Sequence, residues 1–126
     1  MPAYEAITSR QVGYAAAALP KYYGVQFSTA GKFEKADGSR PFAGIIQYGS
    51  EAADVVVTVV KGDFPAIATE AIDAGDLVTI ATGADAGKFK VADTAQDVVY
   101  GVAMSAGGAG ELFTLSMLPI MTTISE

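Results

Sequence analysis

Residues 87–117 of the chain read GKFKVADTAQDVVYGVAMSAGGAGELFTLSM. Three runs rich in apolar and β-branched residues alternate here with an Ala-Asp turn and a glycine-rich turn. Alternation of this kind predicts three consecutive β-strands joined by tight connections. This stretch therefore indicates a β fold.

A related stretch precedes it. Residues 31–60 read GKFEKADGSRPFAGIIQYGSEAADVVVTVV. Both stretches open Gly-Lys-Phe, carry Ala-Asp shortly afterwards, place an apolar strand around a glycine, and close on an apolar strand with one threonine. The similarity extends back to YYGVQF at residues 22–27 and GDLVTI at residues 75–80. We interpret residues 22–60 and 75–117 as two pseudo-repeats within a single β domain spanning residues 22–118.

The fold class follows from the many short strands, the frequent Gly and Asp turns and the absence of a long amphipathic helix. The sequence predicts an all-β protein, either a small β-barrel or a compact sandwich. Some connections are expected from local signals. Lys61-Gly62-Asp63 is expected to turn, and the following run from Phe64 to Ala68, interrupted by Pro65, is expected to be a short edge strand.

The core can be predicted from the repeat. Side chains alternate between the two faces of a strand, so a match of Thr58 with Thr114 places two further pairs on one shared face. The predicted core residues are Val57, Val59, Phe113 and Leu115. Thr58, Thr114 and Ser116 are then expected to point outwards. The run from Val55 to Val60 is apolar on both faces, which predicts either burial on both sides or one face against a partner.

Residues 1–21 are expected to form an extended arm outside the repeats, with one helical turn in YAAAAL at residues 14–19 that ends before Pro20. Two alternatives remain open for this arm: a disordered tail, or a segment that becomes ordered on a neighbouring subunit. Its scattered apolar residues favour the second. Pro119 is expected to end the last strand, leaving residues 119–126 as a tail on the body or on a neighbour.

The composition narrows the functional classes. The formal net charge is −6, so a phosphate backbone would be repelled and nucleic acid is not expected as a partner. The chain contains no cysteine and no histidine, which removes thiolate ligands and the commonest general base. It contains no run of about 18 apolar residues and no secretory signal pattern, so neither a membrane span nor secretion is expected.

No chemistry-bearing constellation is expected. The glycine-rich run at residues 107–110 lacks the Lys-Ser/Thr and the helix of a phosphate-binding loop. The carboxylates do not follow the spacing of a calcium loop; they are Asp73, Asp76, Asp85, Asp93 and Asp97. We therefore predict no catalytic residue, no metal site, no cofactor and no enzymatic activity.

One family resembles this chain. The order AGDLV at residues 74–78, GKF at 87–89, YGVA at 100–103 and AGGAGELFTL at 106–115 is similar to capsid decoration proteins of tailed bacteriophages. These cement proteins include the small lambda-type head decoration proteins. The resemblance covers roughly residues 72–117 and implies a small β protein on the outside of the phage head. It also implies a homotrimer whose N-terminal arm contacts the major capsid protein.

Function is therefore expected to be structural: a decoration protein that binds the outer surface of an assembled head and stabilises it. The expected capsid-binding residues of the arm are Pro2, Tyr4, Ile7, Arg10, Val12 and Tyr14. The alternative is a stand-alone β module that binds a ligand such as carbohydrate through its tyrosines. These are Tyr4, Tyr14, Tyr22, Tyr23, Tyr48 and Tyr100.

Overall fold

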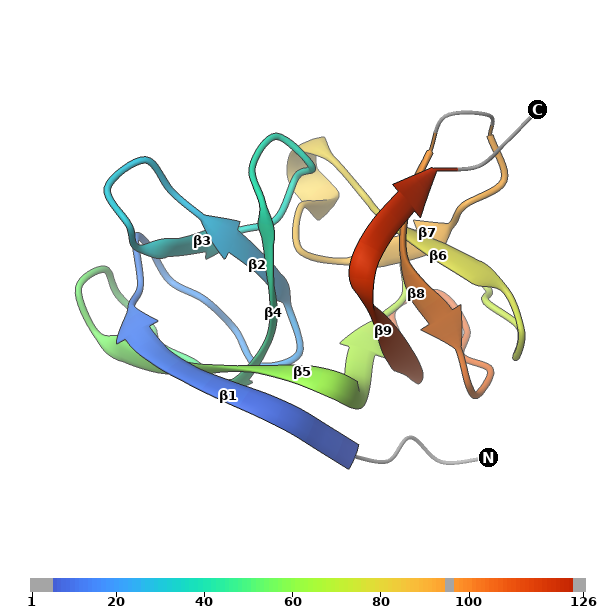
Figure 1. Cartoon of the computed structure of the whole chain (residues 1–126), viewed down its shortest axis with the longest axis horizontal. Coiled ribbons are helices and arrows are strands. Elements are labelled where there is room, and N and C mark those ends of the chain that lie inside the picture. Colours follow the sequence, from blue (N-terminus) through green and yellow to red (C-terminus); the bar gives the residue numbers. More distant parts are fainter. Residues whose placement is uncertain (1–5, 95–96, 124–126) are drawn as a thin grey trace.

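The computed structural model describes residues 6–94 and 97–123 (Figure 1). This part of the chain holds nine β-strands and one short 3₁₀ turn, and no α-helix, so the all-β prediction is confirmed. The elements are β1 (Ala6–Tyr14), β2 (Gly24–Phe27), β3 (Phe33–Lys35), β4 (Phe42–Tyr48), β5 (Val56–Ile67), β6 (Leu77–Ile80), η1 (Gly83–Asp85), β7 (Phe89–Val91), β8 (Val98–Ala103) and β9 (Leu112–Thr123).

The strands form one antiparallel sheet. Its order is β3-β2-β4-β5-β9-β8-β6-β7, and β1 pairs with β5 outside this path. The order defines a first half, residues 6–60, made of β1–β4 and the start of β5, and a second half, residues 61–123, made of the rest of β5 and β6–β9. The halves lie side by side along the long axis of the molecule (Figure 1).

Each half curls until its outer segments meet, as in a barrel. In the first half Ala15 forms a parallel bridge with Phe33, and in the second half Ala68 forms a parallel bridge with Phe89. An antiparallel bridge closes the other end of each half: Leu19 with Ser50, and Ile72 with Gly107. The curl therefore follows the same plan twice.

The strand registers also match as a duplication requires. Phe33 and Phe89 each begin the second strand of a hairpin, and each pairs with the last residue of the first strand, Phe27 or Ile80. The pairing of β1 with β5 is repeated by the pairing of β5 with β9. Tyr14 faces Val56 in the first case, and Ile67 faces Leu112 in the second.

The match means that the repeated unit is longer than the sequence indicated, because it begins at β1. Similarity in this part is carried by backbone geometry and not by residue identity. The N-terminal segment is extended, as predicted, but Ala6–Tyr14 is not detached from the body, since it pairs with β5 of the same chain. No helical turn forms at residues 14–19, where Ala15 and Leu19 are held by bridges instead.

The predicted turn at Lys61-Gly62-Asp63 is wrong, because β5 runs through it as one strand. Gly62 has a φ of 116°, and the register of β1 slips opposite it between Ile7 and Ser9. This is a β-bulge whose extra residue, Thr8, lies in β1, and β5 passes opposite it without ending. A side chain at Gly62 would lie 2.4 Å from the carbonyl oxygen of Ala6, so the bulge also needs glycine for space. The short strand expected at Phe64–Ala68 is accordingly the end of β5 and its following bridge.

The four predicted core residues are buried, with Val57 and Val59 in one apolar cluster and Phe113 and Leu115 in another. The smaller cluster fills the first half. The larger fills the second half and also takes side chains from the outer face of the first half. These are Ala36, Phe42, Ile45 and Val60. The two halves therefore share a core and form one domain.

One outward-facing residue and the end of the last strand differ from the prediction. Thr114 is fully buried, because it lies between two buried neighbours: its strand partner Pro65 and Ser105, whose hydroxyl accepts a hydrogen bond from the Thr114 amide at 2.9 Å. Thr58 and Ser116 are partly exposed. Pro119 does not end the last strand, since β9 continues to Thr123.

Candidate interaction surface

Strand β1 is unusual in how little it buries. Of its nine residues only Ile7 and Gly13 are partly covered, and the others are exposed. Ile7 packs against the larger core cluster. The strand is held mainly by its backbone ladder with β5, and its other edge has no strand partner among the residues that the structure describes. An uncovered edge strand is a feature that natural sheets usually avoid.

Exposed apolar side chains gather where β1 ends. Tyr14 of β1 faces Val56 of β5, while Val12 of β1 and Tyr48 of β4 flank Thr58 of β5 on either side. Neighbours across a sheet lie about 5 Å apart, so these side chains form one surface. We call it the apolar end patch, and it comprises Val12, Tyr14, Tyr48, Val55 and Val56.

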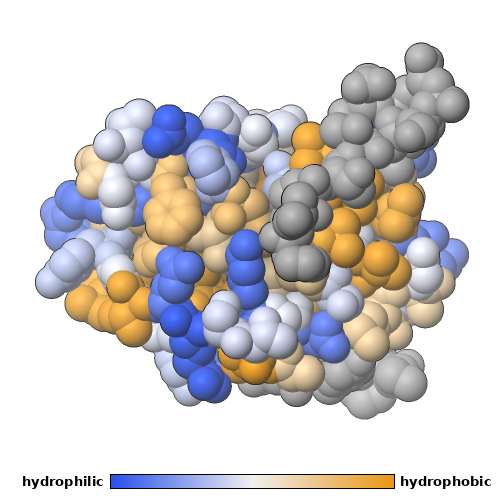
Figure 2. Space-filling model, viewed as in Figure 1, coloured by the Kyte–Doolittle hydropathy of each residue, from blue (hydrophilic) through white to orange (hydrophobic). Residues whose placement is uncertain are grey.

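The patch is well exposed: Val12 is 69% accessible, Tyr48 63%, Tyr14 57%, Val56 52% and Val55 44%. These are five of the eight large hydrophobic residues that are exposed in the described part. Figure 2 shows apolar side chains at its lower left, over the end of the molecule where Figure 1 draws the end of β1 and the start of β5. Clustered exposure of this kind marks interaction surfaces, whereas single exposed residues do not.

A hollow of about 500 Å³ adjoins the patch. Residues 19–21 line one side of it, and residues 49–52 with Val55 line the other. Its floor is fixed by the reciprocal backbone hydrogen bonds between Leu19 and Ser50, both 3.0 Å long. The hollow is large enough to receive one or two side chains of a partner.

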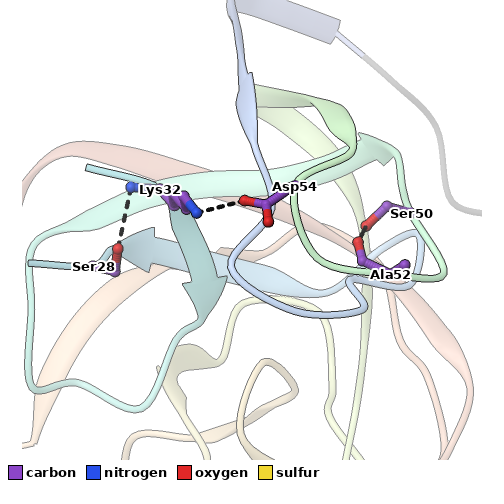
Figure 3. Close-up of polar contacts among 5 residues, drawn as sticks. All are labelled: Ser28, Lys32, Ser50, Ala52 and Asp54. Carbon is purple, nitrogen blue, oxygen red and sulfur yellow. Dashed lines mark hydrogen bonds and ion pairs between the residues drawn. The ribbon is translucent and has the colours of Figure 1, made fainter. Parts of the chain in front are cut away.

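Polar contacts hold the loop that borders this hollow (Figure 3). The Ser50 hydroxyl donates to the carbonyl oxygen of Ala52 at 3.0 Å, and the Lys32 ammonium donates to the Asp54 carboxylate. The backbone amide of Lys32 in turn donates to the Ser28 hydroxyl at 3.1 Å. Asp54 itself has a φ of 63°. The loop is thus tied to the hairpin of β2 and β3, which presents Val55 at a defined position.

The second half provides an internal comparison for the patch. Val56 corresponds to Leu112, because they pair with the matching residues Tyr14 and Ile67. Val55 corresponds to Glu111, since their carbonyl oxygens accept from the amides of Ala15 and Ala68. Tyr48 and Ser105 each lie two residues before a bridge residue, Ser50 or Gly107. The second half therefore forms the same scaffold with a buried serine and an exposed glutamate at two of these positions.

Charge is also divided unequally. Residues 1–60 contain five basic and five acidic side chains, whereas residues 61–126 contain three basic and nine acidic ones. The net charge of −6 therefore belongs entirely to the C-terminal part. Within the two halves, residues 6–60 carry five basic and four acidic side chains, and residues 61–123 carry three basic and eight acidic ones, so the half with the patch is close to neutral and the other is anionic.

The predicted arm residues are distributed around this surface. Val12 and Tyr14 belong to the patch, Ile7 is partly buried, and Arg10 donates from Nε to the side-chain oxygen of Gln47 at 3.1 Å. Pro2 and Tyr4 lie outside the described residues. Val55 and Val56 were not predicted as site residues, and Tyr48 was predicted only as a tyrosine of the alternative carbohydrate-binding module. The signal was present in the run from Val55 to Val60, which is apolar on both faces.

The tyrosines do not form one aromatic platform. Tyr22 packs against Phe64 with ring centroids 5.9 Å apart, and Lys35 lies 5.0 Å above the Tyr23 ring. Tyr100 is 5% exposed and packs edge-on against Phe42 at 5.1 Å. Of the five described, Tyr14 and Tyr48 are the two that remain largely exposed.

A second, smaller pocket of about 210 Å³ lies between the halves, where the Asp37-Gly38 turn approaches Tyr100. Burial raises the pKa of the Tyr100 phenol, and the negative charge of Asp37 raises it further. The pKa of Asp37 is lowered, first by the hydrogen bond from the Ser39 hydroxyl and then by the Ser39 amide. A buried Gln26 also donates to the Asp37 carboxylate at 3.1 Å, so this turn is held by a satisfied polar network.

Across residues 6–94 and 97–123, no three acidic side chains come together in a way that could hold a metal ion. The described chain also lacks a helix of the length and apolarity that a bilayer crossing requires.

The fold places the chain among small antiparallel β modules. It is similar to a solved structure, the N base of head fiber gp8.5 in bacteriophage phi29, with a TM-score of 0.63 and 20% sequence identity. The match covers 94% of this chain and 98% of that one, so the two share their fold over nearly their whole length. No protein-family model matches the chain. No curated protein sequence matches it either.

Proposed function

We propose that this protein is a structural component of a phage head, a decoration protein that binds the major capsid protein on the outer surface of the shell. The observation that carries the proposal is the likeness to the head fiber base over nearly the whole chain. The resemblance of residues 72–117 to capsid decoration proteins, found independently in the sequence, supports the same class.

The proposed role is to bind and to stabilise, not to catalyse. A ligand that binds only the assembled shell shifts the assembly equilibrium toward it, and heat resistance of the head rises accordingly. We propose that Ile7, Arg10, Val12 and Tyr14 take part in the attachment. Homotrimers would strengthen it, because three copies on one rigid body act at high effective concentration.

The test is co-sedimentation of the purified protein with heads assembled from the major capsid protein of the phage that encodes this chain. We expect saturable binding and a raised temperature of head disruption. Failure to sediment with such heads would refute the proposal. Analytical ultracentrifugation of the free protein measures the proposed trimer.

A carbohydrate-binding module remains the second candidate, since Tyr14 and Tyr48 are exposed on neighbouring strands. Aromatic rings that lie open to solvent can pack on sugar rings. Retention on a glycan surface without binding to heads would favour this function over the first.

A further inference from the structure

We propose that the protein is polarised when it is attached: the apolar end patch of the first half docks on an uncharged, apolar area of the shell protein, and the anionic second half points away from the shell. This inference rests on the proposed function and names the surface that performs it. The juxtaposition that carries it is an apolar patch on the nearly neutral half, beside a second half with eight acidic and three basic residues.

In the second half, Ser105 and Glu111 occupy the positions of Tyr48 and Val55. Ser105 is buried and accepts a hydrogen bond from the Thr114 amide, and Glu111 is exposed, so neither leaves apolar surface in water. Tyr48 and Val55 do expose apolar surface to water, which is a cost. A partner that covers them removes this cost.

Charge also differs between the halves. The second half carries eight acidic and three basic residues, and it would lose hydration on burial against a protein surface. The first half is close to neutral, with four acidic and five basic residues, and its acidic Asp54 next to the patch is already paired with Lys32. Interface centres are depleted in charge and enriched in aromatic side chains, as the patch is.

One partner is favoured to cover the patch. Among the described residues, the three exposed large hydrophobics outside the patch are Leu77, Met104 and Leu112. If a second copy of this chain covered the patch, only these three, all on the acidic half, would remain for the shell. The patch and its hollow are therefore assigned to the shell protein.

The experiment compares the same substitution at two equivalent positions. Val56→Asp places a charge in the patch, and Leu112→Asp places it at the matching site of the second half. Both side chains are substantially exposed, so both variants should fold. We expect Val56→Asp to weaken binding to heads about tenfold or more, in line with a residue at the centre of an interface. We expect Leu112→Asp to bind as the unchanged protein does.

A second variant removes the patch without adding strain. Tyr48→Ser with Val55→Glu copies the residues of the second half, which the scaffold already tolerates. Its circular dichroism and melting temperature should stay close to those of the unchanged protein, while binding to heads falls. A folded double variant that binds heads fully would overturn the assignment.

The remaining outcomes are also decisive. If Val56→Asp and Leu112→Asp weaken binding to heads equally, the added charge alone, and not the patch, governs binding. If Val56→Asp dissociates free oligomers in the ultracentrifuge but its subunits still bind heads, the patch joins copies of this chain and the assignment is wrong. If the unchanged protein does not bind heads at all, the proposed function fails first, and the docking surface fails with it.

Discussion

Phe113→Ala tests whether the two halves share one cooperative core. Phe113 is fully buried, pairs with Ala66 across the sheet and meets the Phe89 ring edge-on at 6.4 Å. Both partners belong to the larger cluster, which also contains Phe42 from the first half. Truncation therefore opens a cavity at a point where neither neighbour can easily collapse into it.

The expected loss of folding stability follows from the removal of a whole buried ring. Such truncations cost about 3–5 kcal/mol through lost transfer energy and residual cavity. An unfolding entropy of roughly 2.1 cal/mol/K per residue gives about 0.26 kcal/mol/K for a chain of this length. A loss of about 4 kcal/mol then lowers the melting temperature by about 15 °C.

The assay is chemical and thermal denaturation followed by circular dichroism. The matched control is Leu112→Ala, the adjacent residue on the opposite, exposed face of β9, which should cost less than about 1 kcal/mol. A loss below about 1 kcal/mol for Phe113→Ala would refute the assignment of this face to the core. Two separate transitions in the unchanged protein would refute the shared core itself.

Three further outcomes are expected. Gly101→Ala should destabilise the protein strongly, because a Cβ there would lie 2.3 Å from the backbone oxygen of Ser116. The control is Gly110→Ala, where the space is open and φ is 78°. It should cost only about 1–2 kcal/mol in denaturant melts. The pKa of Tyr100 is raised in the folded state, so this residue contributes its full stabilisation of the fold at pH values below its unfolded-state pKa near 10.0. That contribution is lost as the pH rises through the folded-state pKa. The unchanged protein should thus lose stability more steeply in alkali than Tyr100→Phe, and parallel pH curves would contradict this. Deletion of residues 1–14 should lower the melting temperature, because it removes β1, which pairs with β5 over Val56–Asp63. An unchanged melting temperature would show that β1 does not stabilise the fold.

The sequence was sufficient to predict the all-β class and the four core residues. Those predictions depended on side-chain alternation along a strand, which is a local property that the order of residues determines. The repeat was visible because Gly44 and Gly101 lie where a Cβ would come within 2.3 Å of a backbone oxygen, so no other residue fits there. Positions with such strict steric demands keep their identity in both copies.

Long-range pairing could not be predicted in this way. Lys61-Gly62-Asp63 has the composition of a turn, and only the neighbouring strands decide that Gly62 makes a bulge instead. Likewise, whether Val56 faces solvent or a core depends on which strands lie above it. The patch therefore appears only when the fold is complete.

Strand β5 has a mechanical consequence, because it belongs to both halves at once. Two β modules joined by a flexible linker can be separated by force and unfold independently, one after the other. Here a force applied across the long axis meets a continuous strand that is clamped by β1 on one edge and by β4 and β9 on the other. Backbone ladders along β5 then have to break before one half can be separated from the other.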